Sequence, residues 1–128
     1  MRKNSTVKGN TRMRRGHLEV FSGHTKPSGT KIAIFELPTV EVPAMPFKFA
    51  RVSVPGGANT DPDTHEVREI WLIAQGEARV TIAGNEITVR AGDVLYFDSN
   101  QTHQLFNDSG ESVEFFAVWW RPRGYTPD

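Results

Sequence analysis

Short segments of alternating apolar and polar residues follow one another along most of this chain, with turn-forming residues between them. Residues 31–37 alternate with Ile32 and Ile34 on one side, and Pro38 ends the segment. Further segments rich in β-branched and aromatic residues lie at 47–54, 67–74, 77–82, 86–90, 94–97, from about 103, and at 112–120. A two-residue period is typical of half-buried strands, whereas no segment shows a sustained helical period with capping residues. The pattern predicts an all-β sandwich or barrel with little or no helix.

The chain is expected to form a single domain between two flanking segments. We divide it into a basic N-terminal arm and entry segment at 1–30, a β-barrel at 31–121 and a C-terminal tail at 122–128. The arm carries six Lys or Arg residues within 1–16 and no acidic residue. Aromatic residues are not interleaved with these charges, so a solvated tail or an arm along a partner subunit is favoured over a nucleic-acid contact.

Composition narrows the chemistry that the chain can support. The absence of cysteine removes disulfides, thiolate ligands and cysteine nucleophiles, which leaves His, Asp and Glu as the strong metal ligands. A formal net charge of zero gives no general attraction to nucleic acid or to a membrane. No apolar stretch is long enough for a membrane span or a signal peptide, so a cytoplasmic location is expected.

Two of the four histidines lie in a pattern that suits a metal ion. In a regular strand Asp63, His65 and Glu69 would point to one side, because residues two apart share a face. A row of carboxylates inside a core is costly unless a cation neutralises it. His103 begins a later strand and could approach the same point. Two histidines and one carboxylate suit Fe, Mn, Ni, Co or Zn and leave coordination positions open.

Residues 57–107 resemble the paired sequence motifs of the cupin superfamily. The first motif places a glycine, two histidines, a glutamate and a second glycine at fixed spacing. In this chain Gly57, Asp63, His65, Glu69 and Gly76 keep that spacing, with Asp63 at the position of the first histidine.

The second motif places a glycine, a proline, a second glycine, a histidine and an asparagine at fixed spacing. Gly92, Asp98, Asn100, His103 and Asn107 match it, with Asp98 in place of proline and Asn100 in place of glycine. The second exchange is mild, because asparagine also tolerates a positive φ in a turn.

The resemblance implies a jelly-roll β-barrel that holds one divalent transition metal through His65, Glu69 and His103. Asp63 departs from the family pattern, which usually offers three histidines and a glutamate. It is then either a fourth ligand or an acid/base that acts with Glu69 in catalysis. The alternative is that Asp63 simply belongs to a polar loop and that the metal is weakly bound or lost.

Two further side chains are expected to bind substrate. Arg51 would clamp a carboxylate if its face of the strand points inward, and would cover an interface if that face points outward. Tyr96 could donate a proton or hydrogen bond in the pocket, or it packs with its hydroxyl at the surface, which is the favoured alternative. Aromatic residues on both faces of 112–120 indicate that the outer face meets another sheet or subunit, and a homodimer is expected.

The function expected from the resemblance is metal-dependent catalysis on a small organic metabolite. An Fe(II)-type dioxygenase is the leading interpretation, because the ligand set leaves room for substrate and dioxygen. An isomerase, lyase or decarboxylase could use the same site. A non-catalytic module that binds a small ligand is the alternative outside enzymes.

Overall fold

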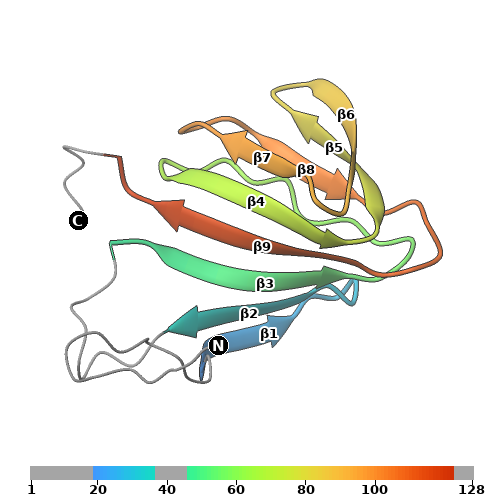
Figure 1. The fold of residues 1–128 in the computed structure, drawn as a ribbon, viewed down its shortest axis with the longest axis horizontal. Coiled ribbons are helices and arrows are strands. Elements are labelled where there is room, and N and C mark those ends of the chain that lie inside the picture. Colours follow the sequence, from blue (N-terminus) through green and yellow to red (C-terminus); the bar gives the residue numbers. More distant parts are fainter. Residues whose placement is uncertain (1–18, 37–45, 123–128) are drawn as a thin grey trace, which may run out of the picture.

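The computed structural model describes residues 19–36 and 46–122, which form two antiparallel β-sheets (Figure 1). The larger sheet has the order β1-β2-β3-β9-β4-β7, and the smaller has the order β6-β5-β8. The strands are β1 (Glu19–Thr25), β2 (Lys31–Glu36), β3 (Lys48–Val54), β4 (Arg68–Gln75), β5 (Glu77–Ile82), β6 (Asn85–Arg90), β7 (Val94–Phe97), β8 (His103–Phe106) and β9 (Val113–Trp120). These two ranges contain no helix, as the alternating pattern predicts. In particular, the described residues include no helix long and apolar enough to cross a membrane.

The strands from β2 to β9 begin and end within one residue of the segments that alternation predicts. Strand β1 was not predicted: it lies in the expected entry segment and adds an edge strand to the larger sheet by pairing with β2. The basic arm at 1–16 and His17 lie outside the described residues, as does the tail beyond residue 122.

The hydrophobic core lies between the two sheets and is built by the inward faces of β3 to β9, with Ile32 of β2 packed against it. In β9, Val113, Phe115 and Ala117 are buried, whereas Glu114 and Phe116 between them are not. Each fully buried large apolar side chain contributes about 1.5–3 kcal/mol through removal from water. The buried residues that complete this cluster are Val52, Val54, Trp71, Ile73, Ala78, Val80, Val89, Leu95, Phe97 and Leu105.

The segment at 59–63 lies alongside β8 and widens the smaller sheet. Isolated bridges pair Asn59 with Phe106 and Asp63 with His103. Between them, the Thr60 N–H donates to the Leu105 carbonyl at 2.9 Å. This pairing fixes a loop that contains Pro62 against a regular strand, and it places Asp63 beside the first residue of β8.

The outer face of the larger sheet carries several large apolar side chains, Leu72, Val94 and Phe116 among them. Directly paired residues of antiparallel strands point to the same face, so the register aligns side chains in rows across the sheet. One row contains Phe35, Phe49, Val118, Ile70 and Tyr96, and the next contains Phe116, Leu72 and Val94 together with Arg51, which pairs with Phe116. We call the apolar members of these two rows the outer apolar face. Of these, Leu72, Val94 and Phe116 are 41%, 61% and 37% exposed.

Candidate metal centre

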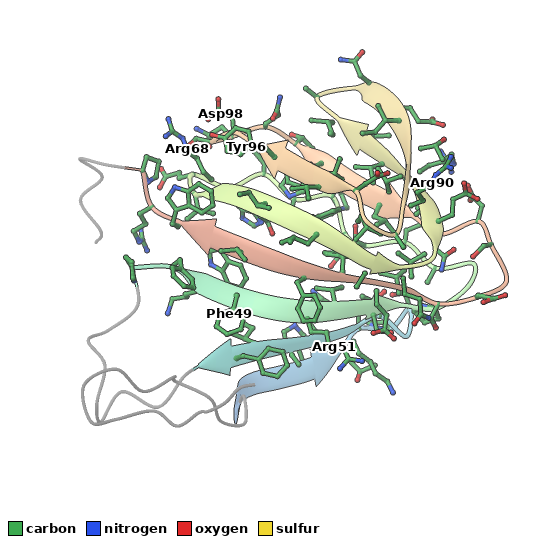
Figure 2. All side chains as sticks on the ribbon, viewed as in Figure 1. Phe49, Arg51, Arg68, Arg90, Tyr96 and Asp98 are labelled. Atoms are coloured by element: carbon green, nitrogen blue, oxygen red, sulfur yellow. The ribbon has the colours of Figure 1, made fainter. Side chains whose placement is uncertain are left out.

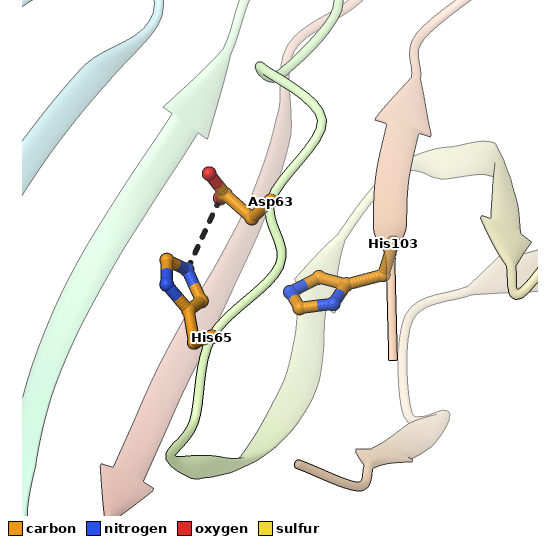
Figure 3. Close-up of side chains that lie close together, drawn as sticks. All are labelled: Asp63, His65 and His103. Atoms are coloured by element: carbon orange, nitrogen blue, oxygen red, sulfur yellow. Dashed lines mark ion pairs between the residues drawn. The ribbon is translucent and has the colours of Figure 1, made fainter. Parts of the chain in front are cut away.

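Asp63, His65 and His103 bring one ligand atom each to within 4.8 Å of one another (Figure 3). The backbones of Asp63 and His103 exchange two N–H to carbonyl hydrogen bonds, both of 3.0 Å. His65 follows two residues later, and its Nε2 lies 3.8 Å from Asp63 Oδ2. Residues that are 40 positions apart in the sequence are thus held together by the backbone of the 59–63 segment and β8.

The expectation of one regular strand from Asp63 to Glu69 is wrong. Asp63 pairs with β8 in the smaller sheet, whereas Glu69 pairs with β7 and β9 in the larger sheet. Residues 64–67 are not part of a strand: the chain leaves its pairing after Asp63, and β4 begins only at Arg68. The side chains meet because the chain crosses between the sheets, not because they share a pleat.

The turn before His103 is shaped by the two residues that depart from the second motif. Asn100 has a φ of 61°, which confirms that it takes the left-handed conformation of the expected glycine. The Asp98 side chain accepts from the Ser99 N–H at 3.0 Å and from Arg68 Nε at 3.2 Å. These bonds lower the pKa of Asp98, with the Ser99 N–H as the largest cause. The carboxylate therefore stabilises the turn that delivers His103 to the site.

Glu69 contacts this group through His103. Its side chain is 12% exposed, and its Oε1 lies 3.1 Å from His103 Nε2. The Trp71 Nε1–H donates to Glu69 Oε2 at 2.9 Å and fixes the carboxylate. Trp71 is also a core residue, 3% exposed. The signal for its second role is that it shares a strand face with Glu69 two residues earlier.

The His103 ring is held on all sides. It is 3% exposed, stacks on Phe97 at a centroid distance of 4.0 Å and meets the edge of Trp71 at 5.3 Å. Its Nδ1 lies 2.9 Å from the Gln101 carbonyl oxygen, which can only accept, so Nδ1 carries the proton. In a neutral ring Nε2 is then a lone pair that faces a carboxylate oxygen.

Two acceptors at 3.1 Å need a cation between them or beside them, either a proton or a metal ion. A histidine whose other nitrogen donates to a backbone carbonyl is the usual arrangement of a metal ligand. Two imidazoles with carboxylates also form a donor set that suits divalent transition metals. The residues at this site therefore fit a divalent metal, and its identity is open among Fe, Mn, Ni, Co and Zn.

The pKa values of Asp63 and His103 are both raised in the folded protein. Burial raises the pKa of the Asp63 carboxyl, while His65 and His103 oppose the rise and the Glu69 carboxylate adds to it. Burial lowers the pKa of His103, but the hydrogen bonds to Glu69 and to the Gln101 carbonyl outweigh it and leave the pKa raised. Without a metal, the folded protein thus holds protons at this site more tightly than the unfolded chain does.

We call Asp63, His65, Glu69 and His103 the metal-ligand group. A cavity of about 200 Å³ adjoins this group and lies between the larger sheet and the 59–63 segment. Asp63 and Glu69 line it on the side of the metal-ligand group. Apolar side chains form much of the rest of its wall: Ile32, Val52, Trp71, Phe115, Ala117 and Trp119. Lys26 and Thr30 also line it. No sequence pattern marked either residue, because their position depends on the turn between β1 and β2.

Arg51 and Tyr96 lie elsewhere. The neighbours of Arg51 in β3, Ala50 and Val52, point into the core, so Arg51 points outward and its guanidinium binds Glu114 Oε1 at 2.9 Å (Figure 2). The Tyr96 hydroxyl donates to Asp98 at 3.3 Å on the same outer side. Neither residue lines the cavity, and the substrate-binding role expected for them does not fit their positions.

The comparisons with known proteins agree with this architecture. A family model described as a cupin domain matches residues 50–119, which is more than half of the chain. An oxalate-binding protein from Thermotoga maritima is 35% identical over 71 residues, and this match covers 55% of the chain and 59% of that relative.

Two solved structures share the fold. A predicted oxalate decarboxylase from Thermotoga maritima is 26% identical with a TM-score of 0.65, over 79% of this chain and 91% of that one. A Cupin 2 conserved barrel domain protein from Salinispora arenicola is 23% identical with a TM-score of 0.64, over 92% and 90% of the two chains. The chain therefore belongs to the cupin family, and its two sheets form a cupin jelly roll.

Proposed function

We propose that this chain is a metal-dependent cupin enzyme that acts on a small organic acid. The observation that carries the proposal is that Asp63 and Glu69 belong to the metal-ligand group and also line the 200 Å³ cavity. A ligand in the cavity would therefore touch the same carboxylates that lie beside His103. A cavity that combines apolar walls with a few polar and charged side chains is the usual form of a small-molecule site.

A divalent cation held by Asp63, His65, Glu69 and His103 would supply a Lewis acid that anchors a carboxylate of the substrate. Trp71, which is 3% exposed, fixes the orientation of Glu69. Trp71 and Phe115, both buried, line the cavity. Asp63, which lines the cavity, is placed to move a proton to or from the substrate when the metal is held by His65, Glu69 and His103 alone.

Dioxygenation with iron is the reaction that the two-histidine, one-carboxylate set favours. Decarboxylation is the second candidate, supported by the Asp63 carboxyl group at the cavity wall and by the relatives named as an oxalate-binding protein and a predicted oxalate decarboxylase. Simple binding without turnover remains the alternative outside enzymes, in keeping with the name of the first of these relatives.

Metal analysis, together with assays of oxygen uptake and CO₂ release, tests the proposal. Protein without a histidine tag would be loaded with Fe(II) or Mn(II) and mixed with a panel of small acids while oxygen uptake and CO₂ release are followed. Oxygen uptake in step with acid consumption indicates a dioxygenase, CO₂ release without net oxygen uptake indicates a decarboxylase, and saturable binding alone indicates a binding module.

The variants His103→Ala and His24→Ala form a matched pair for this experiment. Both change a histidine, but His24 lies exposed in β1, outside the metal-ligand group. We expect His103→Ala to lose metal and activity together and His24→Ala to keep both. Failure of the parent protein to bind a stoichiometric metal despite supplementation would overturn the proposed function.

We also propose that the outer apolar face packs against a second copy of the chain. Large apolar side chains are aligned there across five neighbouring strands, and several are more than a third exposed. A contiguous exposed surface of this kind is a common mark of a protein–protein contact. A homodimer would remove these side chains from water.

A further inference from the structure

Lys26 is the only cationic side chain among the described residues that line the cavity. It lies in the turn between β1 and β2, which is closed by the Lys26 N–H donating to the Thr30 carbonyl at 2.8 Å. Its ammonium group donates to Asp61 Oδ2 at 2.9 Å. The turn and the 59–63 segment thus place one positive charge on a wall of the cavity.

The ion pair between Lys26 and Asp61 is exposed to solvent, which allows another anion to compete for the ammonium group. The side chains of Lys26 and Asp61 are 37% and 64% exposed, and ion pairs between exposed groups are weak because water screens them. Asp61 can therefore turn into solvent if another anion reaches the ammonium group. The hydrogen bond that Lys26 donates to Asp61 keeps the pKa of Lys26 raised, and Asp63 adds to this at longer range, so the amine is charged.

The charges lining the cavity are unequal in number. Asp61, Asp63 and Glu69 supply three carboxylates against the single ammonium of Lys26. A divalent cation at the metal-ligand group would neutralise the charges of the Asp63 and Glu69 carboxylates, because both belong to that group. Lys26 and Asp61 would remain as a separate pair, and an incoming carboxylate could replace Asp61 without changing the total charge around the ammonium.

We propose that Lys26 holds a second anionic group of the substrate, so that the site takes small dicarboxylic acids bound at both ends. This inference rests on the proposed function, in which the first carboxylate lies at the metal. Apolar side chains such as Ile32 and Val52 line the wall and would contact the hydrocarbon middle of the ligand. The cavity of about 200 Å³ has the volume of roughly seven water molecules, which is more than a two-carbon diacid fills.

The test compares two acids of equal length that differ in one carboxylate. Glutarate and valerate would be titrated into the Mn(II)-loaded protein by isothermal titration calorimetry. We expect glutarate to bind about tenfold more tightly, which corresponds to one charge-assisted contact of about 1.4 kcal/mol. Lys26→Met should reduce the affinity for glutarate to that for valerate and leave valerate unchanged.

Two further variants separate ligand binding from a structural role. Asp61→Asn removes the competing carboxylate, so it should tighten glutarate binding about threefold. If the pair only joined the turn to the 59–63 segment, Asp61→Asn and Lys26→Met would instead change affinity in the same direction, and equally for both acids. Lys31→Met is the matched control, because Lys31 is exposed at the start of β2 and does not line the cavity.

The outcomes distinguish this inference from the proposed function. Equal affinities of the parent protein for glutarate and valerate would overturn the role of Lys26 but leave a metal-dependent acid site in place. Binding of neither acid by the Mn(II)-loaded protein would overturn both proposals. A loss of valerate affinity in Lys26→Met would also contradict the inference, since valerate has no group for Lys26 to hold.

Discussion

Trp71→Phe tests whether the hydrogen bond to Glu69 prepares the site for a metal. Trp71 is 3% exposed and stacks on Phe115 at a centroid distance of 4.2 Å. Phenylalanine keeps an aromatic ring in that position but removes the Nε1–H that donates to Glu69 Oε2 at 2.9 Å. Glu69 is 12% exposed, so water can replace the lost donor only in part.

The magnitude follows from the kind of bond that is lost. A hydrogen bond to a charged group is worth about 1.5–3 kcal/mol, so the metal-free variant should lose stability on this scale in urea unfolding. Loss of a group that orients a metal ligand typically lowers metal affinity by about 10- to 100-fold. We therefore expect Mn(II) affinity to fall by that factor in a calorimetric titration.

Trp119→Phe is the control, because it removes the same atoms from another wall of the cavity and leaves the Glu69 hydrogen bond intact. It should bind Mn(II) with the affinity of the parent protein. If Trp71→Phe also keeps the parent affinity within about twofold, Glu69 is either not a ligand or not oriented by Trp71, and the reasoning fails.

Three other predictions follow from the site and the fold. Asp63→Asn should lower Mn(II) affinity more than about tenfold if Asp63 is a ligand, and Asp63→His should restore it; retained affinity with lost turnover would identify an acid/base instead. The raised pKa of His103 contributes stability below the ordinary histidine value near 6.5, and this contribution is lost as pH rises through the folded pKa. Urea unfolding of the metal-free protein should therefore show lower stability at pH 8.5 than at pH 6, and His103→Asn should flatten that dependence. Leu72→Lys on the outer apolar face should shift a dimer towards monomer in light scattering after gel filtration, whereas Ile87→Lys, at a site 40% exposed in β6, should not; a monomeric parent protein would contradict the proposed dimer.

The strands were predictable because their signals are local. Alternating apolar and polar residues mark the predicted strands. The turns between them contain turn-forming residues such as Gly84 and Gly92, whose φ values are 87° and 97°. Strand β1 escaped because its sequence, EVFSGHT, ends in small and polar residues. Its place in the sheet comes from pairing with β2, which a local pattern does not contain.

The candidate site was predictable in its members but not in its construction. Fixed spacing pointed to His65 and His103, but it could not show that the chain changes sheets after Asp63. Arg51 was ambiguous for a physical reason. Phe49 on its own face and Val52 on the other are both apolar, so the pattern does not say which face is the core.

The metal-ligand group is unevenly buried, and this sets an order for metal exchange. His103 is 3% exposed and Glu69 12%, whereas Asp63 and His65 are 43% and 46% exposed. The inner pair is fixed by stacking and hydrogen bonds, so the outer pair should release an ion first and meet an arriving ion first. A chelator would therefore approach from the side of His65. The rate of metal loss should depend on substitutions at His65 far more than on those at Phe97, even where both weaken binding equally.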